Sequence, residues 1–171
     1  MSLNILRIQG DLVLSNTNIL LKVLLTRQSQ IPLLIQKHLE QGATKVENEI
    51  YQSVVEELVK YLPAGWEKVD MYAEVTEEHS CVFFFTMING EYIYSEDFSE
   101  KYDIDASDIG FELYPILLPD QQEKKWFSMS FYLKNTGEFN VEYDYDKPEN
   151  IVIYRDNWIV RHMKENDKNG K

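Results

Sequence analysis

The sequence has few of the features that mark secreted or membrane proteins. Its 171 residues include one cysteine, Cys81, which excludes an internal disulfide framework and favours a reducing compartment, the cytoplasm. The leucine-rich stretch 19–25 is preceded by Asp11 and followed by no small-residue cleavage site, so we expect no signal peptide. No stretch approaches the roughly 20 apolar residues that span a bilayer.

Basic residues are also scarce. Seventeen Lys and Arg stand against twenty-nine Asp and Glu, which gives a formal net charge of −12. Because binding to nucleic acid or to an anionic membrane needs clustered cations, we expect neither as a partner. The charge favours a basic partner that is attracted over a distance, although an acidic surface also serves plain solubility.

Sequence motifs for catalysis are missing. The chain has no glycine-rich phosphate loop, no H-E-x-x-H, no C-x-x-C and no G-x-S-x-G. Its three histidines, at positions 38, 79 and 162, fall on separate predicted elements. Cys81 adjoins an apolar run, which is typical of a buried structural cysteine. We therefore expect no enzymatic activity, no cofactor and no metal.

The clearest strand signals lie in the middle of the chain. Alternation of apolar and polar residues indicates a half-buried strand near 69–75. A continuous apolar run predicts an inner strand near 81–87, covered on both faces. Asn89-Gly90 then predicts a tight turn into a third strand near 91–95, since both residues accept a positive φ.

A second region of alternation predicts a long hairpin, with strands near 127–134 and 138–146, one apolar face and one solvated face. Its second strand carries three carboxylates at every second position on the solvated face: Glu142, Asp144 and Asp146. Their spacing of about 7 Å along a straight strand does not converge on one ion, which disfavours a metal site. A solvated face and a docking face for a basic partner both fit.

Helical spacing of apolar residues predicts three helices, over residues 29–41, 44–62 and 107–123. The last of these contains Pro115, so we expect a broken helix or two short ones. An acidic loop is expected over residues 98–109, where one lysine stands among many carboxylates. Short apolar runs over 151–154 and 158–160 suggest a strand followed by a helix.

These elements together predict an α+β fold, in which an antiparallel sheet packs against helices. We expect a single domain over residues 1–164, with residues 1–45 as an amino-terminal extension or subdomain. Residues 165–171 are expected to form a disordered tail.

Several segments resemble one known family in their order and spacing. They are Leu62-Pro63-Ala64-Gly65-Trp66-Glu67-Lys68-Val69, Met71-Tyr72-Ala73-Glu74-Val75, Val82-Phe83-Phe84-Phe85, Tyr92-Ile93-Tyr94-Ser95, Trp126-Phe127-Ser128-Met129-Ser130-Phe131 and Gly137-Glu138-Phe139-Asn140-Val141-Glu142-Tyr143-Asp144-Tyr145. From about residue 48 to residue 164, the chain is similar to the YezG-like immunity proteins of bacterial polymorphic toxin and contact-dependent inhibition systems. The resemblance implies an α+β fold, no enzymatic activity, and a cytoplasmic protein that binds and neutralises a cognate toxin, often a nuclease.

A nuclease presents a basic surface that binds phosphate, so an acidic protein that covers it gains association rate and selectivity from charge. Affinity then depends on a few aromatic anchors, for which we expect exposed tyrosines. The residues expected to contact the toxin are Glu91, Tyr92, Tyr94, Asp97, Glu100, Asp103, Asp105, Asp108, Tyr132, Glu142, Asp144 and Asp146.

Two other functions fit the sequence alone. The chain fits a non-catalytic adaptor or regulatory domain that binds a host protein unrelated to toxins. It also fits an enzyme with an unrecognised carboxylate site built from Glu142, Asp144 and Asp146. A toxin gene next to this gene favours immunity, and metal bound to the purified protein favours the enzyme.

Overall fold

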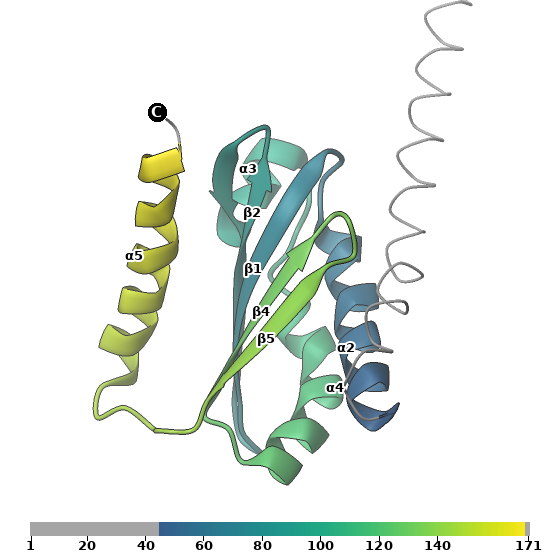
Figure 1. The fold of residues 1–171 in the computed structure, drawn as a ribbon, viewed down its shortest axis with the longest axis vertical. Coiled ribbons are helices and arrows are strands. Elements are labelled where there is room, and N and C mark those ends of the chain that lie inside the picture. Colours follow the sequence, from purple (N-terminus) through teal and green to yellow (C-terminus); the bar gives the residue numbers. More distant parts are fainter. Residues whose placement is uncertain (1–44, 170–171) are drawn as a thin grey trace, which may run out of the picture.

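The computed structural model describes residues 45–169, with side chains for residues 48–163, and the helix expected near 29–41 lies outside this part. Helices cover both sides of a curved sheet (Figure 1). The elements, in which η marks a turn of 3-10 helix, are α2 (Lys45–Leu58), η1 (Val59–Tyr61), β1 (Trp66–Val75), β2 (Ser80–Ile88), β3 (Glu91–Tyr94), η2 (Ser95–Asp97), α3 (Phe98–Tyr102), α4 (Ile109–Lys124), β4 (Ser128–Lys134), β5 (Phe139–Asp144) and α5 (Ile151–Asn169).

The sheet has five strands in the order β3-β2-β1-β4-β5, and every neighbouring pair is antiparallel. The predicted α+β fold is confirmed, and each predicted strand is present to within a few residues. β1 lies in the centre, between β2 and β4. β3 and β5 form the two opposite edges, which separates the acidic segment that follows β3 from the carboxylates of β5.

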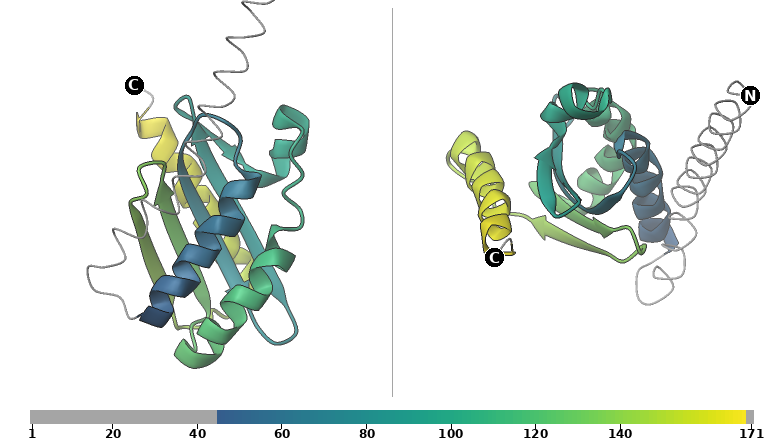
Figure 2. Two further views of the ribbon diagram at one scale, coloured as in Figure 1. Left: turned by 90° about the vertical axis from the view of Figure 1, so that its right-hand side faces the viewer. Right: turned by 90° about the horizontal axis from the view of Figure 1, so that it is seen from above.

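One face of the sheet is covered by α2 and α4, which lie side by side in Figure 2. The helix predicted over 44–62 is confirmed as α2 with the 3-10 turn η1 at its end. Its apolar stripe meets α4 and the sheet in a single large core. That core includes Val54, Val55 and Leu58 of α2, Leu113 and Leu117 of α4, and Met71, Phe84 and Phe131 of the sheet.

The expectation of a broken helix near Pro115 is wrong, because α4 is one continuous helix of 16 residues with Pro115 and Pro119 inside it. Each proline removes one backbone donor, at a cost of about 3 kcal/mol in a helix interior. Both prolines are exposed, so water can solvate the carbonyl groups that lose their partners. The opposite side of α4 buries Leu113 and Leu117, and this burial holds the helix together.

The segment expected to be an acidic loop contains a short helix, α3, and that expectation is wrong in this respect. Its first residue, Phe98, is fully buried and packs edge-to-face on Phe84 of β2, with ring centroids 5.4 Å apart. Ala106 is also buried in the large core, and Tyr102 and Ile104 pack against it, whereas the charged side chains of the segment are exposed.

The second face of the sheet is covered by α5, where we expected a strand over 151–154 followed by a helix. That expectation is wrong, because one helix runs from Ile151 to Asn169. Helix therefore occupies residues 165–169, within the segment for which we expected a disordered tail. Seen from above, α5 lies on the side of the sheet opposite α2 and α4 (Figure 2).

A second apolar cluster joins α5 to this face. It consists of Tyr72 of β1, Phe83 and Phe85 of β2, and Trp158 of α5. The Trp158 ring lies 5.4 Å from the Tyr72 ring and 5.5 Å from the Phe83 ring. The solvated face expected for the hairpin is therefore partly covered, since Trp158 Nε1 also donates a hydrogen bond of 2.9 Å to Ser130 Oγ of β4.

Replacing Trp158 with alanine should lower the free energy of unfolding by about 3 kcal/mol, because a large buried side chain is removed and a cavity remains. Val160 is on the same helix but 41% exposed, so Val160→Ala should change the free energy of unfolding by less than about 0.5 kcal/mol. Urea denaturation of both variants measures this. Equal effects would show that α5 does not stay on the sheet in solution.

Candidate partner-binding site

The edge of the sheet at β3 carries a groove of about 370 Å³, which opens between β3 and α5. Its lining residues come from β2, the β2–β3 turn, β3, η2 and α5. They are Phe85, Gly90, Glu91, Tyr92, Tyr94, Asp97 and Met163. Four of the twelve residues expected to contact a partner therefore share this groove: Glu91, Tyr92, Tyr94 and Asp97.

The hydroxyl of Tyr92 is held in place by two charged side chains of β1, Lys68 and Asp70. Lys68 Nζ donates hydrogen bonds to the Tyr92 hydroxyl (2.8 Å) and to Asp70 Oδ2 (2.9 Å), and the hydroxyl donates to the same Asp70 oxygen (3.0 Å). Burial raises the pKa of Tyr92, so its hydroxyl stays protonated at neutral pH. The ring is therefore fixed in one orientation in the groove.

Tyr94 is fixed by rings rather than by charges. It stacks on Phe85 with centroids 4.9 Å apart, meets Phe83 edge-on, and donates a hydrogen bond of 3.2 Å to Glu96. Burial raises its pKa as well. Tyr92 and Tyr94 are half-buried, so the expectation of exposed tyrosines is wrong for both.

Tyr132 also differs from that expectation, since it is half-buried under the carboxyl-terminal part of α5. Its ring stacks on His162 at 6.0 Å, and its hydroxyl donates a hydrogen bond of 3.3 Å to Glu142. Tyr132 lies on β4, away from the groove at β3.

The acidic side chains that follow β3 are all exposed. They are Glu96, Asp97, Glu100, Asp103, Asp105 and Asp108. Asp103 ends α3 in the left-handed conformation, with φ 57°, and this turns the chain toward α4. Hydrogen bonds from Ser107 hold the pKa of the Asp105 carboxyl below its usual value, so this charge persists to lower pH.

The three carboxylates near the end of β5 do not form the expected straight row. Glu142 is exposed, Asp144 is half-buried and accepts a hydrogen bond of 2.7 Å from the Tyr154 hydroxyl, and Asp146 lies beyond the end of β5. They sit at the edge opposite β3. Among the described residues, no group of three or more His, Cys, Asp or Glu side chains is arranged to hold a metal ion.

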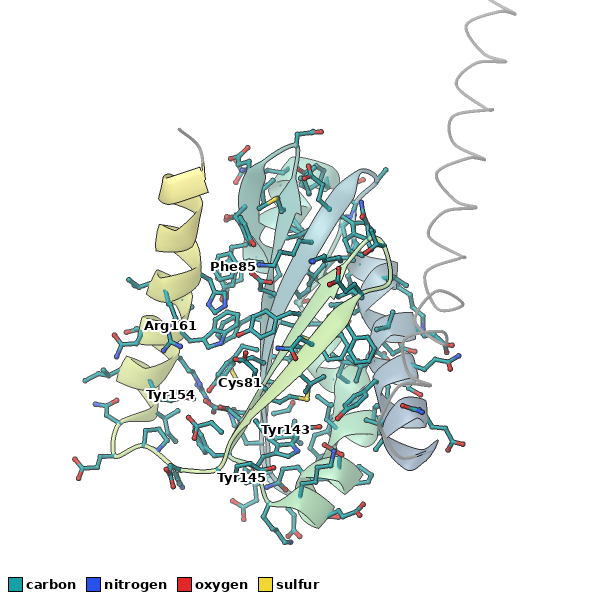
Figure 3. All side chains as sticks on the ribbon, in the orientation of Figure 1. Cys81, Phe85, Tyr143, Tyr145, Tyr154 and Arg161 are labelled. Carbon is teal, nitrogen blue, oxygen red and sulfur yellow. The ribbon has the colours of Figure 1, made fainter. Side chains whose placement is uncertain are left out.

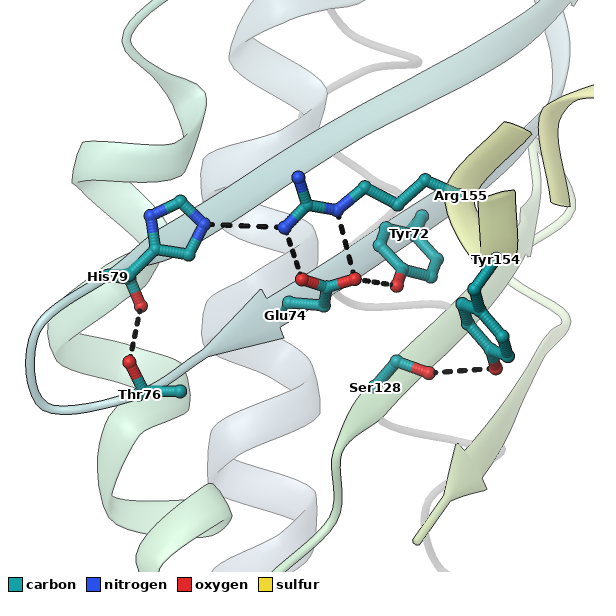
Figure 4. Close-up of polar contacts among 7 residues, drawn as sticks. All are labelled: Tyr72, Glu74, Thr76, His79, Ser128, Tyr154 and Arg155. Atoms are coloured by element: carbon teal, nitrogen blue, oxygen red, sulfur yellow. Dashed lines mark hydrogen bonds and ion pairs between the residues drawn. The ribbon is translucent and has the colours of Figure 1, made fainter. Parts of the chain in front are cut away.

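A buried charged network that the sequence pattern did not predict lies under α5 (Figure 4). β1 is buried on both faces, so the prediction of a half-buried strand is wrong, and Glu74 is only 3% exposed. Arg155 of α5 binds Glu74 with two nitrogens: Nε donates to Oε1 at 3.0 Å, and Nη2 donates to Oε2. The Tyr72 hydroxyl donates to the same carboxylate.

The surroundings of this network set its charge state. The hydrogen bonds to Glu74 raise the pKa of Arg155, and burial raises the pKa of Tyr72, so the arginine stays charged and the tyrosine neutral. Arg155 Nη2 also lies 3.4 Å from His79 Nε2, in the β1–β2 turn. Arg155 and Trp158 recur at helical spacing with Tyr154 and His162, and this spacing is the signal that could have identified α5.

The family model of the YezG-like immunity proteins matches residues 48–162, a range that includes most of α2, all five strands, α4 and most of α5. This chain belongs to the YezG-like immunity protein family. The expected resemblance is thereby confirmed.

Two relatives of this YezG-like chain are named Immunity protein YezG. The one from Bacillus spizizenii is 28% identical over 109 residues, which cover 57% of this chain and 68% of that protein. The one from Bacillus subtilis is 30% identical over 110 residues, which cover 57% of this chain and 72% of that protein. In the described part of our YezG-like chain, no helix has the length and apolar character needed to cross a membrane.

Cys81 of this YezG-like protein packs against the second apolar cluster and is half-buried, where we expected a buried structural cysteine. Burial raises the pKa of its thiol. The thiol is therefore protonated, and a poor nucleophile, at neutral pH.

Replacing Arg155 with methionine should lower the free energy of unfolding by about 3 kcal/mol, because the Glu74 carboxylate stays buried without its cation. The double variant Glu74→Gln with Arg155→Met should recover most of that loss. Guanidinium denaturation of wild type and both variants measures the difference.

The exposed pair of Lys134 and Glu138 supplies the control, since both side chains are more than half exposed. Lys134→Met should cost less than about 1 kcal/mol. A similar cost for Arg155→Met would contradict a structural role for the buried pair.

Proposed function

We propose that this immunity protein binds a cognate protein toxin in the cytoplasm and neutralises it, that the toxin is a basic nuclease, and that the edge formed by β3, η2 and α3 makes the first contact. Membership of the family supports the general role. The concentration of charge at this edge supports the choice of partner and surface.

The charge at this edge is the observation that carries the proposal. Residues 91–108 contain seven acidic side chains and one lysine. Lys101 lies 3.4 Å from Glu91, and both side chains are exposed to solvent, so this pair is weak. The remaining carboxylates create a negative field that reaches about one Debye length, roughly 8 Å at physiological salt. A cationic phosphate-binding surface is the protein surface that such a field attracts most strongly.

The groove beside these acids supplies aromatic and apolar contacts, which charged side chains alone do not provide. Tyr92 and Tyr94 line it in fixed orientations, and Met163 of α5 adds a flexible apolar wall that is 55% exposed. Preorganised aromatic rings lose little conformational entropy on binding, so they suit the role of anchors. Attraction by the carboxylates and anchoring in the groove together describe an interface that associates fast and dissociates slowly.

Further apolar residues on α5 extend this surface. The large apolar side chains that α5 leaves exposed are Val152, Ile153, Val160 and Met163. We include them in the proposed interface as a helix face that a protein partner can cover. Tyr132, Glu142, Asp144 and Asp146 lie across α5 from the groove, so in this proposal they touch only a toxin wide enough to reach both edges.

The proposal is tested by reversing Asp97, Asp103 and Asp105 together to lysine. Association with the catalytically inactive toxin encoded beside this gene should slow at least tenfold at low salt, and the difference should shrink at high salt as the charges are screened. Binding kinetics at two salt concentrations measure this effect. Protection of growing cells against the active toxin should fall in parallel.

A charge-matched control reverses Glu78, Glu123 and Glu149 to lysine. These three acids are exposed in the β1–β2 turn, the end of α4 and the loop before α5. Equal slowing by both triple variants would assign the effect to net charge and contradict the β3–α3 edge. Binding without any inhibition of nucleic-acid cleavage would contradict the nuclease part of the proposal.

A further inference from the structure

A larger cleft lies at the other end of the sheet, away from the proposed toxin-binding edge. Its volume is about 500 Å³, within the range of about 300–1,000 Å³ that is typical of small-molecule sites. The β1–β2 turn, the end of α4, the loop after β5 and the first turns of α5 form its walls. Its lining residues include Glu74, Lys125, Phe127, Tyr145, Lys147 and Arg155.

The cleft is basic in a protein whose net charge is −12. Lys125, Lys147 and Arg155 line it, against one carboxylate, Glu74. Because Arg155 and the Tyr72 hydroxyl both bind that carboxylate, its charge is compensated within the fold. In the described part of the chain, neither Lys125 nor Lys147 forms an ion pair. Two lysines that form no ion pair with a described residue therefore line this space.

The backbone holds both lysines near the start of a helix. Lys125 ends α4 in the left-handed conformation, with φ 61°, and its N–H donates to the Gln121 carbonyl at 2.7 Å. Lys147 lies in the short loop before α5, whose first residue, Ile151, also lines the cleft. Asn150 Oδ1 accepts a hydrogen bond of 3.1 Å from Ile153 N–H, and the dipole of α5 adds positive potential at this end of the helix.

The rest of the lining is apolar and aromatic. Phe127 is half-buried and packs edge-to-face on Tyr154, with centroids 5.6 Å apart. Tyr145, labelled in Figure 3 near the end of β5, is 57% exposed. Val75 and Ile151 complete this part of the wall. A flat apolar body can lie against these side chains and still reach the lysines.

We infer that this cleft binds a small organic anion, a planar ring that carries a carboxylate or a phosphate group. The acidic group lies between Lys125, Lys147 and the first turn of α5, and the ring packs against Phe127 and Tyr145. A long polyanion is disfavoured, since the surrounding protein surface is strongly acidic and the positive charge is confined to the cleft. The site is separate from the toxin-binding edge and does not depend on the proposed function.

The test uses four probes on the full chain: phenyl phosphate, benzoate, inorganic phosphate and the uncharged benzyl alcohol. Chemical-shift titration in solution should show saturable changes, confined to residues around the cleft, for phenyl phosphate, benzoate or both. Inorganic phosphate and benzyl alcohol, which each lack one half of the ligand, should bind at least tenfold more weakly. Whichever of the two ring anions binds more tightly identifies phosphate or carboxylate as the natural group.

The matched variants are Lys125→Ala with Lys147→Ala, and Lys60→Ala with Lys101→Ala. All four lysines are solvent-accessible, so both double variants should fold, which their thermal unfolding checks. The first double variant should weaken binding of the ring anion at least tenfold, and the second should leave it unchanged. The inference is overturned if neither ring anion gives saturable shifts, if benzyl alcohol binds as tightly, or if both double variants behave alike.

Discussion

The ion pair between Glu74 and Arg155 is the interaction on which the arrangement of this protein depends. A carboxylate that is 3% exposed on the central strand is costly unless a cation reaches it. Among the described residues, the bidentate partner comes from α5, so the pair fixes the helix on the second face of the sheet. The position of α5 then creates both concave sites, since the helix forms a wall of the groove at β3 and a wall of the cleft at the other end.

The two sites divide the surface by charge. Near β3, exposed carboxylates surround a groove with fixed tyrosines, whereas the cleft beside Lys125 and Lys147 is basic and aromatic. A uniformly acidic surface would repel every anion. Here α5 lines both the acidic region that we propose for a basic protein and the basic cleft that we propose for a small acid, so net charge alone describes neither site.

The strands could be predicted from sequence because their signals are local: alternation near 69–75 and 127–134, and Asn89-Gly90 at a turn with positive φ. The residues of the groove could be selected by charge and residue type, but their exposure could not. Whether Tyr92 is exposed depends on Lys68 and Asp70, more than twenty residues away in sequence. The first turns of α5 were mistaken for a strand for a similar reason, since the inward face of this helix mixes arginine and histidine with apolar residues, and Arg155 has its partner in the distant, buried Glu74. The continuity of α4 could not be predicted because it depends on tertiary packing, which places both prolines on the exposed side of the helix.

The central position of β1 has a consequence for how the protein comes to be folded. β1 pairs with β2 across a four-residue turn, but Val69 pairs on its other side with Leu133, more than sixty residues later in the chain. Contacts of such high sequence separation form slowly, because a long loop must close before they are made. During synthesis, the central strand therefore waits with one unpaired edge until β4 leaves the ribosome. Glu74 of the same strand gains its cation later still, after Arg155 has been added to the chain.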